Sequence, residues 1–219
     1  GFFFIPLIPR KCFRKVVAKK LGLVYVPKTT VAINLLDTWF SYGLNGKMVF
    51  ILADSWYTSK KLIKKCIELN LILIGCLKRN RLLNGKRMEN YRCGLRRNQK
   101  VEKSDDKYLY RLYHRIGTLS GITNPITVLL SQRIRLSDGR KSWRYILCTK
   151  MDMSVLKILD WYKKRWAVET FHQIWKAVFG TKNWRLQSVC GIQNLSTITV
   201  MAIGFSVHLH VCLLYTSPS

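Results

Sequence analysis

The sequence predicts an α/β fold, in which a mixed sheet is flanked by helices and extended by a β-rich insertion. The first observation behind this prediction is a pair of apolar runs of strand length, MVFILAD and LILIGCL, which enclose a helical segment. The second is a group of three further segments with strand character, followed by a helical stretch from about Ser154. The third is composition, because 219 residues with 48% hydrophobic content can bury the core of one sizeable domain.

The N-terminal part predicts a strand and then a helix. Residues 2–8, FFFIPLI, have strand character interrupted by a proline. Thr29 or Thr30 caps a helix that runs to about Tyr42 and is followed by a turn at Asn45–Gly46. The predicted buried face of this helix consists of Val31, Leu35, Leu36, Trp39 and Phe40.

The next elements form a predicted right-handed βαβ unit. Its first strand ends at Asp54, its helix runs from Ser59 to about Leu69, and its second strand ends at Leu77. The first strand, a continuous apolar run, is predicted to be buried on both faces of a parallel sheet. Asp54 then lies at the carboxyl end of a parallel strand, where α/β sheets bind their ligands. The residues alone leave open the alternative that Asp54 only caps the following helix.

A basic run and a β-rich stretch follow. In Lys78–Lys100 nine of 23 residues are basic and one is acidic, so the run, which includes Arg79 and Arg81, either tracks phosphates or forms a solvated loop. Strand character returns in YLYRLYHRI, NPITVLLSQRIRL and SWRYILCTK. We expect four parts of the chain: a core over 1–78, the insertion over 79–150, a helical part of the core over 151–211, and a tail over 212–219.

The charge predicts a polyanionic partner. With 38 Lys plus Arg against 11 Asp plus Glu, the net charge of +27 favours nucleic acid over the alternatives, a ribosome-associated or membrane-surface protein. Residues 196–215 carry no charge, so we weigh a membrane span against a buried C-terminal helix and favour the helix. The seven cysteines form no closely spaced pair, which argues against a zinc ribbon or a disulfide framework. We expect most of them to be small core residues of a protein in a reducing cytoplasm.

The segment WYKKRWAVETFHQIWK, residues 161–176, is predicted to be a helix with a polar seam. At about 3.6 residues per turn, Tyr162, Arg165, Glu169 and Lys176 share one side of it, which faces solvent or a cleft. The alternative is an ordinary solvated face on which Arg165 and Glu169 pair. Trp166, near this seam, is a candidate for contacting an unpaired base. The opposite arc should pack on the sheet and contains Trp161, Val168, Phe171, Ile174, Trp175 and Val178.

The spacing Tyr-x2-Arg-x3-Glu-x6-Lys in this helix resembles the signature of bacterial insertion-sequence transposases with a DDE, RNase H-like catalytic domain. The segment ILADSWYTSKKLI, which contains Asp54, also resembles the family's second-aspartate segment, and the β-rich stretch resembles the family's insertion. The resemblance covers about residues 1–205. It implies an RNase H-like mixed sheet with the insertion between the second and third catalytic carboxylates.

This resemblance implies a DNA transposase that cuts insertion-sequence ends and joins the 3′-hydroxyl to target DNA. Asp54 and Glu169 would be two of three carboxylates that hold two Mg²⁺ or Mn²⁺ ions. Tyr162, Arg165 and Lys176 would bind phosphates of the double-stranded transposon end. The resemblance also implies a homodimer that acts on paired transposon ends. Such a protein would lie in the bacterial cytoplasm, associated with the nucleoid, and would not bind a membrane.

The first aspartate of the family's site has no counterpart here. Only Asp37 precedes Asp54 among the acidic residues, and it lies inside a predicted amphipathic helix, so we do not assign it the role. We therefore expect a truncated fragment that begins inside the fold, lacks the first strands and is inactive alone. The tail CLLYTSPS resembles a translated sequencing adapter and is excluded. The alternative function is a basic, non-catalytic nucleic-acid-binding remnant of such an enzyme.

Overall fold

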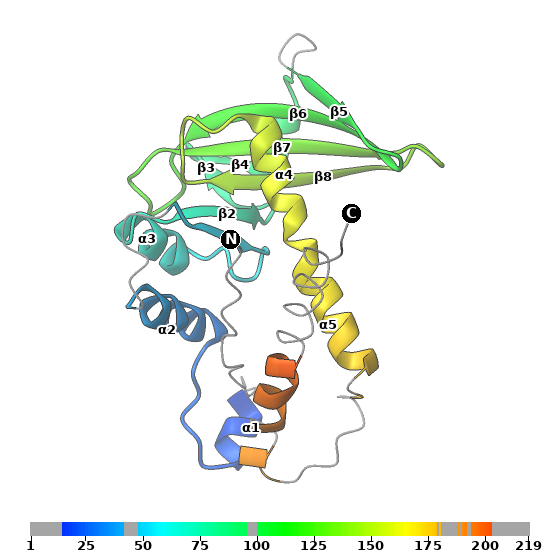
Figure 1. The fold of residues 1–219 in the computed structure, drawn as a ribbon. Helices are drawn as coiled ribbons and strands as arrows, with labels where there is room; N and C mark the ends of the chain where they lie inside the picture. The colour runs from blue at the N-terminus through cyan, green and yellow to red at the C-terminus, as the bar shows by residue number, and fades with distance from the viewer. Residues whose placement is uncertain are drawn as a thin grey trace. The chain divides into compact units, whose positions relative to one another are not determined.

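A computed structural model describes residues 15–41, 48–95, 100–178, 180, 188, 190–191 and 194–202 of the chain (Figure 1). The chain divides into two compact units. The central unit is Lys28–Trp166, and the terminal unit combines Gly1–Pro27 with Ala167–Ser219. The strand predicted over 2–8, the turn at Asn45–Gly46 and the tail over 212–219 lie outside the described residues.

A six-stranded mixed sheet forms the central unit, in the order β1-β2-β8-β7-β6-β5. β1 and β2 are parallel, and each of the other neighbouring pairs is antiparallel. The prediction of an α/β fold with a mixed sheet and helices is therefore confirmed. The strands are β1 (Phe50–Ala53), β2 (Ile72–Leu77), β5 (Val101–Ser104), β6 (Tyr108–Gly117), β7 (Ile126–Arg135) and β8 (Lys141–Cys148).

The predicted βαβ unit is present as β1, α3 (Lys60–Glu68) and β2. Ser59 caps α3, since its side chain accepts a hydrogen bond of 3.3 Å from the amide of Leu62. Leu62, Ile63 and Cys66 form the buried face of the helix, as the spacing indicated. The expectation that the first strand is buried on both faces is wrong, because β1 is at one edge of the described sheet and only Ala53 is fully buried.

The β-rich stretch extends the same sheet. β8 pairs with β2, with Ile74 opposite Cys148, and therefore lies between the βαβ unit and the rest of the stretch. The basic run before it forms a small hairpin, β3 (Leu82–Leu83) and β4 (Lys86–Arg87), and the 3-10 helix η1 (Met88–Arg92). Leu83 and Met88 anchor this segment because both are fully buried. The alternative that this run is only a solvated loop therefore does not hold for Leu82–Arg92, although most of the side chains there are exposed.

Helices cover the two faces of the sheet. On one face α3 packs with α2 (Lys28–Phe40), whose Leu36 is buried while Val31 and Leu35 of the predicted face are only partly so. Asp37 of α2 forms an ion pair of 2.8 Å with Lys65 of α3, in keeping with its place on an amphipathic helix. The other face carries α4 (Val155–Lys164), which begins after Ser154 as predicted. Its core cluster contains Ile74, Tyr110, Leu112, Leu129, Ile146, Cys148, Ile158, Leu159 and Tyr162.

The terminal unit contains α1 (Lys15–Lys20), most of α5 (Trp166–Val178) and a helical segment over residues 194–202. In the part of the chain that the structure describes, no helix is long and apolar enough to cross a membrane. The expectation that most cysteines are core residues is only partly met. Of the five described cysteines, Cys66 and Cys148 are buried, Cys76 is partly buried, and Cys93 and Cys190 are exposed.

Candidate active site

Asp54 is held in a defined orientation directly after β1. Its Oδ1 atom accepts hydrogen bonds from the amides of Trp56, at 2.9 Å, and Tyr57, at 3.0 Å. Its carbonyl oxygen accepts bonds from the amide and the hydroxyl of Thr58, at 3.0 and 2.6 Å. Asp54 therefore shapes the turn that follows the strand, while Ser59 caps α3, so the alternative that Asp54 caps this helix is wrong.

A close approach to β2 fixes this turn. Thr58 is buried against Gly75, where a Cβ would lie 2.5 Å from the threonine hydroxyl oxygen. Only glycine leaves room for that contact. The register that pairs Ala53 with Gly75 also places Asp54 level with the next residue of β2, Cys76.

Lys78 lies beside the same turn, because the carboxyl ends of parallel strands meet at one edge. Its Nζ atom is 5.2 Å from the centre of the Trp56 ring, a cation–π geometry. Trp56 itself is 78% exposed, so it is a rim residue and not part of the core. Tyr57 is exposed as well. The structure thus brings Lys78, one of the predicted DNA-binding residues, next to the Asp54 turn.

Tyr162 is only 6% exposed and packs on the sheet with Ile158 and Leu159 of α4. Burial, followed by the interaction with the side chain of Cys76, raises its pKa to about 12. Tyr162 therefore does not face solvent, but it does line a cavity, which is the other position that the polar seam predicted. The ring of Tyr162 extends the apolar side of α4, and its hydroxyl interacts with Cys76 of β2. Helical periodicity in the sequence cannot predict a contact with a strand.

Arg165 interrupts the predicted helix. α4 ends at Lys164, the amide of Arg165 donates to the carbonyl oxygen of Tyr162 at 3.1 Å, and α5 begins at Trp166. The guanidinium carbon of Arg165 is 5.5 Å from the centre of the Tyr162 ring. Tyr162 and Arg165 therefore lie together at the end of α4, and both line a cavity in the central unit.

Glu169 and Lys176 follow on α5, in the terminal unit. Glu169 is partly exposed and Lys176 is exposed. Val168, predicted to pack on the sheet, is instead 54% exposed. The side chains of Phe171, Ile174, Trp175 and Val178 lie outside the described part of the structure. Of the four signature residues, Tyr162 and Arg165 thus belong to the central unit, and Glu169 and Lys176 belong to the terminal unit.

Asp54 and Tyr162 belong to one face of the sheet. Side chains alternate along a strand, and Phe50 and Leu52 of β1 pack in the cluster under α4, so Asp54 follows on that face. Trp161 of α4 stacks on Phe50, with ring centres 4.1 Å apart. Cys76 of β2 relates the two residues, since it is level with Asp54 and interacts with the side chain of Tyr162.

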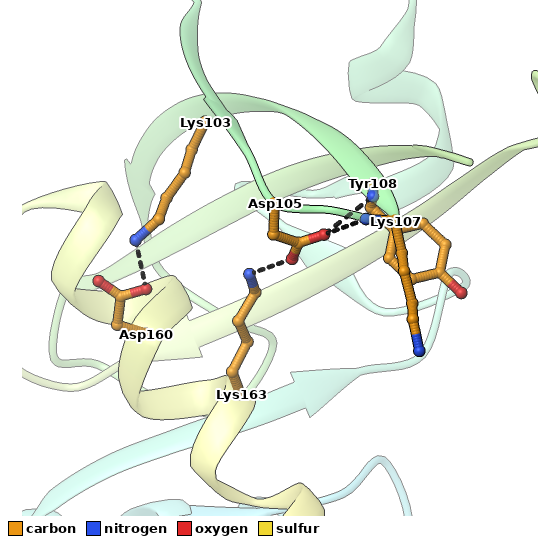
Figure 2. Close-up of polar contacts among 6 residues, drawn as sticks. All are labelled: Lys103, Asp105, Lys107, Tyr108, Asp160 and Lys163. Carbon is orange, nitrogen blue, oxygen red and sulfur yellow. Dashed lines mark hydrogen bonds and ion pairs between the residues drawn. The ribbon is translucent and has the colours of Figure 1, made fainter. Parts of the chain in front are cut away.

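Two ion pairs also connect α4 to strand β5 and the turn that follows it (Figure 2). Lys103 of β5 donates to Asp160 at 2.7 Å, and Lys163 donates to Asp105, in the β5–β6 turn, at 2.8 Å. Asp105 also accepts bonds from the amides of Lys107 and Tyr108, at 3.1 and 2.8 Å. Burial alone would raise the pKa of Asp105, but these hydrogen bonds outweigh it and lower the pKa to about 2. We call these two pairs the α4 clasp.

The other predicted DNA-binding cations differ in availability. Arg79 and Arg87 both lie 3.8 Å from Glu89, so the single acidic residue of the basic run partly neutralises them. Arg81 is partly buried, and its Nη2 atom has no hydrogen-bond partner among the described residues. Lys78 and Arg79 keep exposed side chains.

Sequence reasoning missed Arg144. This residue of β8 lines the same cavity as Tyr162 and Arg165, and its positive charge acts on the Tyr162 hydroxyl. The alternation in the strand SWRYILC contained the signal, since Arg144 shares a face with the core residue Ile146.

Carboxylate oxygens are the ligands that Mg²⁺ and Mn²⁺ prefer, so the chemistry of Asp54 and Glu169 suits these ions. Both hydrogen bonds from the described turn go to Oδ1 of Asp54. Among the residues with a described position, no three His, Cys, Asp or Glu side chains gather into a metal-binding cluster.

Most of the chain matches a known family. Residues 16–205 match the family described as the transposase DDE domain. A search of curated proteins found no match.

Proposed function

The chain belongs to the DDE transposase family, and on that premise we propose that its domain cleaves insertion-sequence ends and joins the freed 3′-hydroxyl to target DNA. The family consists of enzymes that bind DNA and generally use divalent metals. The observation that carries the proposal is the position of Asp54, at the carboxyl end of a parallel strand and on the sheet face covered by Tyr162 of α4. The proposal also includes an RNase H-like core and a homodimer that acts on paired transposon ends.

Asp54 and Glu169 would hold the divalent cations. A bound cation activates the attacking hydroxyl and stabilises charge on the leaving oxygen. The chain's own contribution at Asp54 is orientation, because two backbone amides hold Oδ1 in place. A carboxylate held in this way needs little reordering when a cation arrives.

Cationic side chains would hold the DNA strand beside these carboxylates. Arg165 offers a planar fork of donors that matches two phosphate oxygens. Tyr162, buried and protonated, supports that guanidinium from below with its ring. Lys78 lies next to the Asp54 turn, and Lys176, Arg79 and Arg81 supply further positive charge. The net charge of +27 over the whole chain favours association with a polyanion such as DNA.

The test compares Asp54→Asn and Glu169→Gln in the full reading frame that contains this chain, by Mg²⁺-dependent nicking of supercoiled plasmid. Asparagine keeps an oxygen that accepts the two turn hydrogen bonds, so Asp54→Asn removes charge without removing the turn. We expect both variants to lose nicking while retaining DNA binding. Asp152→Asn is the matched control, because Asp152 is an exposed carboxylate 3.8 Å from Lys150.

A second candidate is a DNA-binding remnant without catalysis, favoured by the structural role that Asp54 already has in its turn. It predicts no metal-dependent nicking and a salt-sensitive affinity that is indifferent to DNA sequence. Nicking that survives in Asp54→Asn would show that this carboxylate only shapes the turn. Absence of nicking in every variant and in the unmodified protein would favour the remnant.

A further inference from the structure

A cavity of about 510 Å³ lies within the central unit, between the end of α4 and strands β6, β7 and β8. We propose that it binds a phosphate group of a DNA strand through Arg133 and Arg144, two arginines outside the signature helix. This inference rests on the proposed function, since it adds a contact to the same substrate. We call the space the arginine cavity and define it by Arg133, Arg144, Lys163, Tyr108 and Tyr110.

Strand pairing places the two arginines on one face. Arg144 of β8 is opposite Ser131 of β7, and Arg133 of β7 is opposite Ser142 of β8, so all four side chains share a face. Tyr110 of β6 is opposite Arg133 and joins them. Deeper under α4 the same face is apolar and fully buried, at Leu129, Ile146 and Cys148. The face therefore changes from a packed core to a polar, cationic floor where the cavity opens.

The charge of this cavity is positive. Five cationic side chains and two carboxylates line it, which gives a net formal charge of +3: Lys107, Arg133, Arg144, Lys163 and Arg165 against Asp105 and Asp106. Asp105 is already engaged by Lys163 at 2.8 Å. Arg133 and Arg144 form no ion pair with any described residue. Two partly buried guanidinium groups without a carboxylate are arranged for an external anion.

Arg133 and Lys163 are also held in place before any ligand arrives. Arg133 donates from Nε to Ser142 Oγ at 3.3 Å, and its guanidinium carbon is 4.4 Å from the centre of the Tyr108 ring. Lys163 lies 4.1 Å from the centre of the Tyr110 ring and is fixed by the α4 clasp. Holding flexible cations in one geometry lowers the entropy lost on binding. Guanidinium forks match phosphate oxygens, which makes a phosphodiester the favoured ligand.

The experiment measures binding of a fluorescein-labelled DNA duplex to the full chain by anisotropy, over a range of salt concentrations. Arg133→Gln with Arg144→Gln should weaken binding about ten-fold and flatten the slope of log K against log salt by roughly 0.9 for each phosphate that is no longer neutralised. The matched control is Arg140→Gln with Lys141→Gln, which removes two exposed charges from the same β7–β8 hairpin outside the cavity. It should change the affinity and the slope much less.

An equal change in both double variants would overturn the inference, since it would reflect general charge only. Circular dichroism checks whether Arg133→Gln with Arg144→Gln still folds. If it does not, Arg133→Lys with Arg144→Lys is tested instead, because lysine keeps the positive charge but lacks the forked donors of the guanidinium group. This second variant should bind more weakly than the unmodified chain, and unchanged binding would refute the proposal.

Two further arms separate the alternatives. Absence of any DNA binding by the unmodified chain would refute the proposed function as well, whereas binding that the cavity variants do not alter refutes this inference alone. Calorimetric titration with inorganic phosphate tests for a small free anion. Phosphate binding that is lost in the cavity variant, with DNA affinity unchanged, would assign the cavity to a small anion and overturn the proposal.

Discussion

Removing one charge from the α4 clasp should show how much its ion pair adds to the stability of the fold. Asp105→Asn keeps an oxygen for the amides of Lys107 and Tyr108, so the turn before β6 should persist. It removes the charge that pairs with Lys163 at 2.8 Å. The neighbouring Asp106 offers a matched control, because it forms no ion pair with any described residue.

The magnitude follows from the lowered pKa of Asp105, about 2 in the folded chain. An aspartate in an unfolded chain has a pKa of about 3.9. The stabilisation by the charged Asp105 is therefore complete above that pH and is lost as the pH falls toward about 2. Since the side chain is 39% exposed, solvent screens the pair. We therefore expect a contribution of only about 0.5 to 1 kcal/mol to the free energy of unfolding.

Urea unfolding followed by circular dichroism measures this contribution at about pH 6 and about pH 2. Asp105→Asn should be less stable than the unmodified chain by about 0.5 to 1 kcal/mol at the higher pH and equally stable at the lower. Asp106→Asn should match the unmodified chain at both. A loss in Asp105→Asn that is the same at both pH values would refute the reasoning, because it would come from the turn and not from the charge.

Two other predictions concern the candidate site. Gly75→Ala should destabilise the chain by about 1 to 3 kcal/mol, since the new Cβ would lie 2.5 Å from Thr58 Oγ1, and unchanged stability in urea would contradict that close approach. Tyr162 should be among the last described tyrosines to ionise, near its pKa of about 12, so Tyr162→Phe should remove a late step from a spectroscopic titration of tyrosinate. Because this pKa is raised by burial, the associated stability is present below about pH 10 and is lost as the pH rises toward about 12, a loss that Tyr162→Phe should not show.

Local signals in the sequence were enough for the βαβ unit. An apolar run before Asp54, a capping serine at Ser59 and apolar residues at helical spacing each depend on neighbours a few positions apart. The strands of the β-rich stretch were found for the same reason.

The burial of Tyr162 and the helix interruption at Arg165 could not be found in this way. Periodicity groups residues by their angle around a helix, but which side faces the sheet depends on partners such as Cys76, far away in the chain. The arginine cavity likewise depends on the register between β7 and β8, which sets Arg133 opposite Ser142. A predicted pair of strands does not specify that register.

The position of β8 has a consequence for how the chain folds. β8 lies between β2 and β7, yet it is the last strand of this sheet to be synthesised, and the amide of Leu73 in β2 donates at 2.9 Å to Thr149, which follows β8. The βαβ unit and the β6–β7 hairpin can form early, but they become neighbours only when β8 inserts between them. The chain between β2 and β8 must close into a long loop before these two strands can pair. This closure costs entropy before the contacts form, and such non-local pairing slows folding. Substitutions in β8 should therefore slow the step in which the βαβ unit and the β6–β7 hairpin become parts of one sheet. Until β8 has paired, α4 has no complete surface on which to pack.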